Sequence, residues 1–192
     1  MSALKGLKLN LGCNKNYLEG WTNVDIEQYG RVDVCADLND PWPWDDNSVD
    51  YITAYNIVEH LKDPIHIMNE AWRVLKPGAA IEIYVPSTDG RGAFQDPTHI
   101  SFWNENSFAY YTQEGLGNIY SSIKCDYDII LFNTPATSHK IIWVWAICRA
   151  IKESVESPLL THDTILRICQ KMAASFDTKP KEMKEFLVDF QK

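Results

Sequence analysis

Residues 9–14 read Leu9-Asn10-Leu11-Gly12-Cys13-Asn14, an apolar run that breaks at a glycine. A second apolar run ends at Asp25, thirteen residues after Gly12. A glycine at the end of a strand lets the backbone approach a ligand, and a carboxylate after the next strand can accept hydrogen bonds from both hydroxyls of a ribose. The pattern indicates a nucleotide-type cofactor site, although a glycine after a strand is also the ordinary signal for a turn.

Several further apolar runs suit buried strands of a mostly parallel sheet that is covered on both faces. With the first two, they give five predicted strands, at residues 7–11, 21–26, 32–36, 49–55 and 79–86. A helix is predicted between the last two strands, because Asp63 can cap it and Pro64 suits its first turn. Its sheet-facing side is predicted to carry Ile65, Met68, Trp72 and Leu75, and Lys76-Pro77-Gly78 ends it.

The chain also carries six short motifs in a fixed order, at residues 10–14 (NLGCN), 20–26 (GWTNVDI), 37–38 (DL), 47–50 (NSVD), 59–61 (EHL) and 73–79 (RVLKPGA). As a set they resemble the class I S-adenosylmethionine (SAM)-dependent methyltransferases. Within that family they are most similar to the small predicted methyltransferases with a shortened first crossover. The resemblance covers roughly residues 7 to 110.

This resemblance implies an α/β fold with a single doubly wound, mostly parallel, seven-stranded Rossmann-like sheet. Two later apolar runs, residues 123–133 and 140–151, are similar to the antiparallel strand pair that completes such a sheet. We expect a methyltransferase domain over residues 1–151. Helical spacing of apolar residues then predicts two C-terminal helices, which we expect to form an extension over residues 152–192 that packs on the same core. A lid or a dimer contact is the alternative role for these helices.

The chain departs from the family pattern in its first motif. Asn10 stands where an acidic residue is usual, and Cys13 and Asn14 stand where further glycines are usual. Asp25 also comes earlier than the acid of a dinucleotide site, which lies about 20 residues on. The first crossover can therefore hold little helix, and we expect an irregular loop there.

The resemblance implies SAM as the cofactor. Gly12, Cys13 and Asn14 would pass its methionine and ribose portion, and Asp25 would accept hydrogen bonds from the ribose. The predicted cofactor-binding set is completed by Asn10, Ile26, Asp37 and Leu38, the last two beside the adenine, and by Asn56 on the sulfonium side.

Candidate catalytic residues follow the fourth and fifth strands. His99 is the first choice for a general base, because an imidazole with a pKa near 6.5 can accept a proton at neutral pH. Glu59, His60 and Asp96 come next. The alternatives are that His99 is a hydrogen-bonding brace, that His60 is structural, and that Glu59 either binds a substrate hydroxyl or amine or is merely solvated.

Net charge disfavours one class of substrate. The formal net charge is −8, and residues 152–192 contain seven basic and seven acidic residues, so the surplus of acid lies in the first 151 residues. An acidic surface repels phosphate backbones, so the charge disfavours a nucleic-acid substrate. A small-molecule acceptor is expected instead.

Cysteine spacing gives no sign of a metal site. The five cysteines, at positions 13, 35, 125, 148 and 169, form no Cys-x-x-Cys pair and do not alternate with histidines at ligand spacing. We predict reduced, mostly buried thiols, no metal, and a small filler role for Cys13 in the cofactor turn. The longest apolar run, residues 141–148, is too short to cross a bilayer, and we expect a cytoplasmic protein.

A loop with two tryptophans, Trp42 and Trp44, lies between the third and fourth predicted strands. The tryptophans either staple the loop onto the sheet or close over an adenine ring or a substrate.

The sequence thus predicts a SAM-dependent methyltransferase that acts on an oxygen or nitrogen of a small-molecule or sugar-like acceptor. The altered first motif also allows a SAM-binding protein without catalysis. An oxidoreductase of the NAD type is a further alternative, although the full Gly-x-Gly-x-x-Gly pattern is missing.

Overall fold

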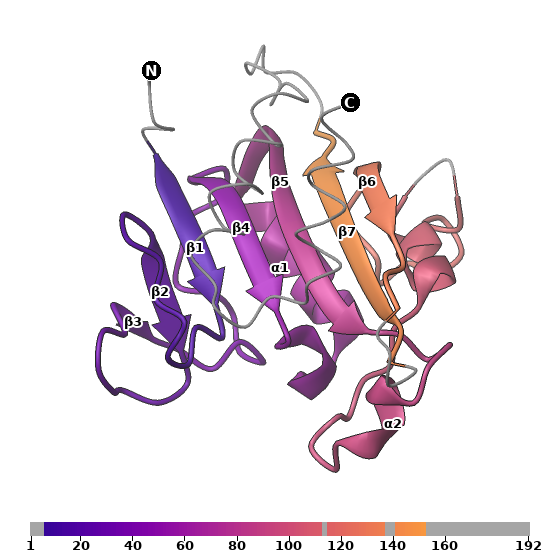
Figure 1. Ribbon diagram of the computed structural model, residues 1–192. Coiled ribbons are helices and arrows are strands. Elements are labelled where there is room, and N and C mark those ends of the chain that lie inside the picture. The colour runs from indigo at the N-terminus through magenta and orange to yellow at the C-terminus, as the bar shows by residue number, and fades with distance from the viewer. Residues whose placement is uncertain (1–5, 113–114, 137–140, 153–192) are drawn as a thin grey trace, which may run out of the picture.

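A computed structural model describes residues 6–112, 115–136 and 141–152 of the 192-residue chain. The described part forms a seven-stranded sheet in the order β3-β2-β1-β4-β5-β7-β6 (Figure 1). The strands are β1 (Leu7–Leu11), β2 (Thr22–Asp25), β3 (Val34–Cys35), β4 (Val49–Tyr55), β5 (Leu75–Pro86), β6 (Tyr127–Asn133) and β7 (Trp143–Ala150). The helical elements are η1 (Val58–His60), α1 (Pro64–Val74), α2 (Gly92–Gln95) and η2 (Glu105–Tyr111).

Strands β1 to β5 run parallel to one another, and β7 runs antiparallel to both β5 and β6. The expected mixed Rossmann-like sheet with an antiparallel C-terminal pair is thereby confirmed. A dinucleotide-binding sheet in its usual order 3-2-1-4-5-6 has no antiparallel strand next to β5. The position of β7 therefore argues against the NAD-type alternative.

The carboxyl ends of β1, β4 and β5 meet at one edge, which is the lower edge in Figure 1. The loops that follow these strands carry the predicted site residues. Open α/β sheets bind their ligands at this edge, so the topology gathers these loops where a ligand is expected.

Both faces of the sheet are buried. The larger core packs one face against α1, which contributes Ile67, Met68, Ala71 and Val74. On the other face, a smaller cluster of buried side chains includes Tyr51, Tyr84 and Trp145 from the strands. Because both faces of the strands are buried, their sequences are nearly continuous apolar runs and do not alternate between apolar and polar residues.

Helix α1 begins as predicted and differs at its buried face. The Asp63 carboxylate accepts hydrogen bonds from the backbone N–H of Ile65 and His66, and Pro64 occupies the first turn. Of the predicted apolar face, Met68 is fully buried, whereas Ile65 and Trp72 are only partly buried. The helix ends at Val74, and Leu75 already belongs to β5.

The first crossover, between β1 and β2, contains no helix, as the early position of Asp25 predicted. The predicted C-terminal helices of residues 152–192 lie almost wholly outside the described residues, so their packing or dimer role stays a prediction. None of the described helices combines the length and the apolar composition needed to cross a bilayer.

A charged network fastens the tryptophan loop to α1. Glu70 accepts two hydrogen bonds from the Arg73 guanidinium, each 2.8 Å long, and one of 2.7 Å from the Trp42 backbone N–H. The Trp42 side chain is buried in the core, and its indole N–H donates to the Leu38 carbonyl. The stapling role is thereby confirmed for Trp42.

We expect the substitution Glu70→Gln to destabilise the fold at pH 7. Hydrogen bonds from Arg73 hold the pKa of Glu70 below its usual value. A lowered pKa in the folded state contributes stability above the unfolded pKa of about 4.3, and this stability is lost as the pH falls through the folded pKa. Urea denaturation should show a loss of roughly 1.5–3 kcal/mol at pH 7, shrinking below about pH 4.

The exposed Glu19 provides the control, because Glu19→Gln should change stability little at either pH. A Glu70→Gln deficit that stays constant between pH 7 and pH 3 would contradict the ion-pair account.

Candidate functional site

The glycine turn after β1 is held by a close contact with the segment after β4. Gly12 has a φ of +61°, and a Cβ placed there would lie 2.7 Å from the Ile57 side chain. Both the backbone conformation and the neighbouring side chain therefore require glycine at this position. The contact brings the predicted cofactor turn directly beside Asn56 and η1, a neighbour that the sequence motifs did not reveal.

The Asp25 carboxylate joins this turn to the end of β2. Its Oδ2 accepts a 2.8 Å hydrogen bond from the Asn14 backbone N–H, and its Oδ1 accepts one of 2.9 Å from the Ile26 N–H. Burial and a hydrogen bond with Asp25 raise the pKa of the Tyr29 hydroxyl to about 12. Asp25 is only partly buried. An ionised carboxylate has about four acceptor sites, so the two N–H groups and the Tyr29 hydroxyl leave about one site for a ribose hydroxyl.

Asn10, predicted to bind the cofactor, is buried under the loop and shapes it. Its Nδ2 donates to the Asn16 carbonyl at 2.8 Å and to Asn23 Oδ1 at 2.9 Å. Asn23 Oδ1 also accepts from the Leu18 N–H, and Asn23 Nδ2 donates to Asp33. A carboxylate at position 10 could not donate these bonds, which explains why an amide replaces the family's acid here.

Cys13 is buried within the turn, and its backbone N–H donates to the Val24 carbonyl. Burial, with the nearby Asp25 and Asp33 adding to it, raises the pKa of the Cys13 thiol to about 11. The thiol is therefore protonated at neutral pH, in agreement with a filler role. Cys125 and Cys148 are also buried free thiols, whereas Cys35 is exposed.

The remaining predicted cofactor residues, Ile26 and the two predicted beside the adenine, Asp37 and Leu38, differ in their placement. Ile26, next to Asp25, is 60% exposed and offers an apolar surface for a flat ring. Leu38 is buried in the core, so only its backbone is available to a ligand there. Asp37 accepts two hydrogen bonds from Asn39, which hold the pKa of Asp37 below its usual value.

All four predicted catalytic residues line one cavity of about 200 Å³, called here the polar cavity. Asn56, predicted on the sulfonium side, lines it as well. The sequence motifs did not reveal the other lining residues, which are Pro86, Gly92, Gln95, Ile141 and Trp143.

Glu59 is the most unusual group of the polar cavity. It is 2% exposed, so the solvated interpretation of this residue is wrong. Neither carboxylate oxygen has a hydrogen-bond partner among the described residues. Burial, with a smaller contribution from Asp96, raises the pKa of Glu59 to about 8.

The two histidines lie edge to face beside this carboxylate, with ring centroids 4.9 Å apart. His99 Nε2 lies 3.9 Å from Glu59 Oε1 and 3.9 Å from Asp96 Oδ2. His99 Nδ1 lies 3.0 Å from the Ala93 carbonyl. A carbonyl oxygen can only accept, so Nδ1 carries the proton and Nε2 has a free lone pair toward the cavity. His99 is thus a brace that still presents a basic nitrogen.

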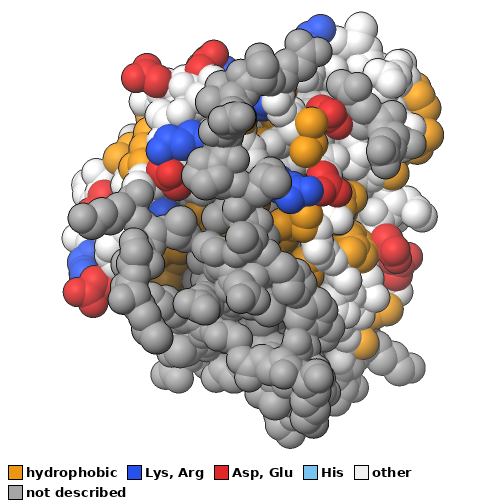
Figure 2. All heavy atoms as spheres, turned by 90° about the horizontal axis from the view of Figure 1, so that it is seen from above, with side chains coloured by type: hydrophobic (Ala, Val, Ile, Leu, Met, Phe, Trp, Pro, Cys, Tyr) orange, Lys and Arg blue, Asp and Glu red, His pale blue; other side chains and the backbone are white. Residues whose placement is uncertain are grey.

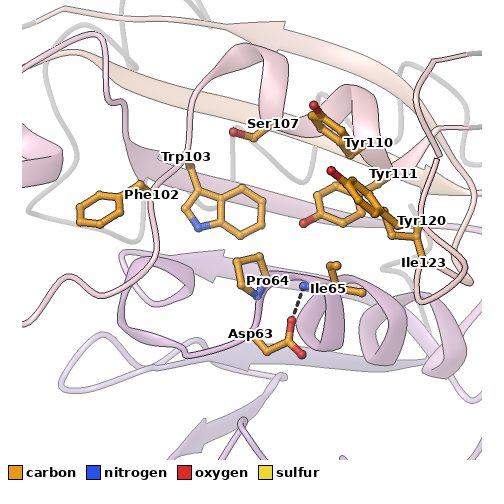
Figure 3. Close-up of a pocket in the computed structure, with 10 residues that line it drawn as sticks. All are labelled: Asp63, Pro64, Ile65, Phe102, Trp103, Ser107, Tyr110, Tyr111, Tyr120 and Ile123. Carbon is orange, nitrogen blue, oxygen red and sulfur yellow. Dashed lines mark hydrogen bonds between the residues drawn. The ribbon is translucent and has the colours of Figure 1, made fainter.

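A second cavity, of about 350 Å³, lies between η2 and the N-terminus of α1, and we call it the aromatic cavity. Figure 3 shows the rings of Trp103, Tyr110, Tyr111 and Tyr120 on one side of it and Pro64 and Ile65 on the other. Its carboxylate, Asp63, already caps α1. It shares no lining residue with the polar cavity, so the four predicted catalytic residues and Asn56 belong to the smaller cavity.

The opposite end of the sheet has a different surface. Figure 2 views the molecule from above Figure 1, away from the carboxyl ends of β1, β4 and β5, and shows acidic and basic side chains interspersed where described residues are visible. A mixed surface of this kind is ordinary for a soluble domain.

Comparison with known proteins agrees with this geometry. Residues 14–83 match the family described as "Methyltransferase domain". A "probable S-adenosylmethionine-dependent methyltransferase" of Mycolicibacterium smegmatis is 32% identical over 76 residues, which are 38% of this chain and 30% of that protein. The chain therefore aligns with less than a third of that relative.

Solved structures share the fold at low sequence identity. A SAM-dependent methyltransferase from Methanosarcina mazei has a TM-score of 0.56 at 14% identity, covering 79% of this chain and 95% of that one. The 1,6-didemethyltoxoflavin-N1-methyltransferase of Burkholderia thailandensis, crystallised with its substrate and S-adenosylhomocysteine, has a TM-score of 0.54 at 13% identity and covers 77% and 72%.

The fold and the glycine turn define a Rossmann-like α/β domain. Residues 14–83 match a methyltransferase-domain family, and solved SAM-dependent methyltransferases share the fold. Two features of the residues present fit SAM: Asp25 keeps acceptor capacity for a ribose hydroxyl, and Ile26 exposes an apolar surface.

We expect Asp25→Ala to weaken binding of S-adenosylhomocysteine about tenfold to a hundredfold, because charge-assisted hydrogen bonds contribute roughly 1.5–3 kcal/mol. Isothermal titration measures this directly. Asp45→Ala is the matched control, because Asp45 is an exposed acid in the tryptophan loop. Equal affinities for both variants and the wild type would contradict the placement of the ribose.

Proposed function

We propose that this chain transfers a methyl group from SAM to an oxygen or nitrogen of a small-molecule or sugar-like acceptor bound in the polar cavity. One observation carries the proposal. The Gly12 turn touches Ile57, while the adjacent Asn56 lines the polar cavity, so the predicted cofactor turn and the cavity are contiguous.

The buried polar atoms of this cavity support the presence of a ligand. Besides both Glu59 oxygens, the indole N–H of Trp143 has no hydrogen-bond partner among the described residues. Buried polar groups in folded proteins are nearly always paired, so each unpaired atom requires an explanation. A polar acceptor would bond both the N–H donor and the carboxylate.

SAM supplies a methyl carbon that is already electrophilic because it is bound to a sulfonium. The protein has to hold the acceptor's nucleophile in line behind that carbon and to exclude water. When the new bond to the acceptor forms, the methyl–sulfur bond breaks, and a hydroxyl or ammonium acceptor also gives up a proton. His99, Glu59, His60 and Asp96 are the groups that face the acceptor during these events.

Size and charge favour a small acceptor. A cavity of about 200 Å³ holds only the reacting part of a molecule. The cavity contains the Asp96 carboxylate, whose charge disfavours a phosphate backbone. The neighbour from Burkholderia thailandensis, whose described substrate is 1,6-didemethyltoxoflavin, supports a small-molecule acceptor for this fold.

A SAM-binding protein without turnover is the second candidate, and the altered first motif favours it. Asn10 and Cys13 serve the packing of the loop in this chain. Such a protein would bind S-adenosylhomocysteine normally and would methylate no acceptor.

Turnover is tested by incubating the full chain with SAM and a panel of hydroxylated and amine-bearing small molecules, while release of S-adenosylhomocysteine is measured. With an accepted substrate, His99→Ala should lower kcat about a hundredfold or more, because groups that assist proton removal contribute that much. Its affinity for S-adenosylhomocysteine should stay within about twofold of wild type.

His66 provides the matched control, since it lies on α1 outside the polar cavity and its Nε2 contacts the Asp40 carbonyl. His66→Ala should turn over normally. Methylation by His99→Ala at the wild-type rate would contradict the placement of the acceptor, and cofactor binding without turnover on any acceptor would favour the second candidate.

A further inference from the structure

Three potential metal ligands converge in the polar cavity. Glu59 and His60 come from η1, and His99 comes from the loop after α2. One ligand atom of each residue lies within 4.8 Å of those of the other two. Two imidazoles and one carboxylate form a recurrent ligand set for first-row divalent metal ions.

The Glu59 carboxylate lies in this cluster and has no hydrogen-bond partner in the described part of the chain. It is 2% exposed, neither oxygen accepts a hydrogen bond from the described residues, and its Oε1 lies 3.9 Å from His99 Nε2. An ionised carboxylate that is buried in this way needs a compensating positive charge. A cation between the carboxylate and the imidazoles would supply that charge.

The hydrogen bonds of the Nδ1 atoms of both histidines resemble those of histidines that bind a metal through Nε2. His99 donates from Nδ1 to the Ala93 carbonyl at 3.0 Å. His60 Nδ1 lies 3.2 Å from the Thr98 carbonyl and 3.1 Å from the Thr98 hydroxyl, whose proton is donated to Asp96. Both Nδ1 atoms therefore carry protons, which leaves each Nε2 free. Metal-bound histidines typically donate their other ring N–H to a carbonyl or carboxylate in this manner.

We propose that Glu59, His60 and His99 bind a divalent transition-metal ion of the Zn²⁺ type. Nitrogen ligands favour such an ion over Mg²⁺ or Ca²⁺, which prefer oxygen. Zn²⁺ takes its ligands at about 2.0–2.2 Å, so the cluster has to close by roughly 1 Å around the ion. The partly exposed His60 leaves room for this adjustment, and Asp96 Oδ2, 3.9 Å from His99 Nε2, adds negative charge.

The ion has a consequence for the acceptor, and this part rests on the proposed methyl transfer. A divalent ion in the polar cavity would bind the acceptor's oxygen and lower the pKa of its hydroxyl, which makes the oxygen a better nucleophile. Binding of the ion itself does not depend on turnover.

The test uses the full chain after removal of metals with a chelator. Isothermal titration with Zn²⁺ should show one site per chain, and Mg²⁺ at the same concentrations should give no signal. Glu59→Gln and His99→Asn should each weaken Zn²⁺ binding about a hundredfold or more. These changes remove one ligand while keeping a side chain of similar size.

Two control variants exclude other ligands. Cys35 is an exposed thiol, and His66 lies on α1 outside the cluster, so Cys35→Ser and His66→Asn should bind Zn²⁺ like the wild type. Loss of binding in Cys35→Ser with full binding in Glu59→Gln would overturn the proposal, as would the lack of any Zn²⁺ binding by the wild type.

A second measurement on the wild type avoids variants that fail to fold. Titration with paramagnetic Co²⁺ should broaden the ring signals of the ligands His60 and His99 in NMR spectra far more than those of His66. Uniform effects on all three histidines would overturn the site.

Activity then separates the two proposals. If S-adenosylhomocysteine binds and an acceptor is methylated at the same rate with and without Zn²⁺, His99 acts as a metal-free base and the metal role is overturned. If Zn²⁺ binds at the cluster but no acceptor is methylated, the metal site stands and the proposed function fails.

Discussion

The buried hydrogen bond between the side chains of Asn10 and Asn23 is the interaction on which the cofactor edge depends. It joins β1 to β2 where the crossover between them has no helix to hold it. Bonds from these two amides to Asn16, Leu18 and Asp33 fix the remaining loop. In this loop the Asn14 N–H donates a hydrogen bond to the Asp25 carboxylate. The carboxylate therefore lies beside the glycine turn although the crossover is short.

The polar cavity contains a group that destabilises the folded protein, the buried carboxyl of Glu59. Glu59 is buried at the end of the core with no hydrogen-bond partner among the described residues, and the chain has placed two histidines beside it. Natural sequences break the rule that buried polar groups are paired chiefly at functional sites. Gly12 lies against Ile57, whose neighbour Asn56 lines this cavity. The fold thus brings the loops after β1, β4 and β5 to one edge of the sheet.

Much of the fold could be predicted from the sequence, because buried strands leave a simple apolar signal. The ranges of β1 and β4 coincide with the predicted ones, and Asp63 and Pro64 marked the start of α1. The buried face of α1 was predicted imperfectly, since helical spacing alone does not say which side meets the sheet. The convergence of Glu59 with His99 could not be predicted from spacing, because the two residues meet only through the sheet.

The central claim is that the loops at the carboxyl ends of β1, β2 and β4 hold SAM. Its most direct test is an amide NMR spectrum of the full chain recorded during titration with S-adenosylhomocysteine. We predict that the largest chemical-shift changes fall at Gly12 to Asn14, Asp25, Ile26 and Asn56. The amide signals at the amino ends of the strands should stay unchanged. Shifts centred on the aromatic cavity, around Trp103 and Tyr111, or no shifts at all, would contradict it.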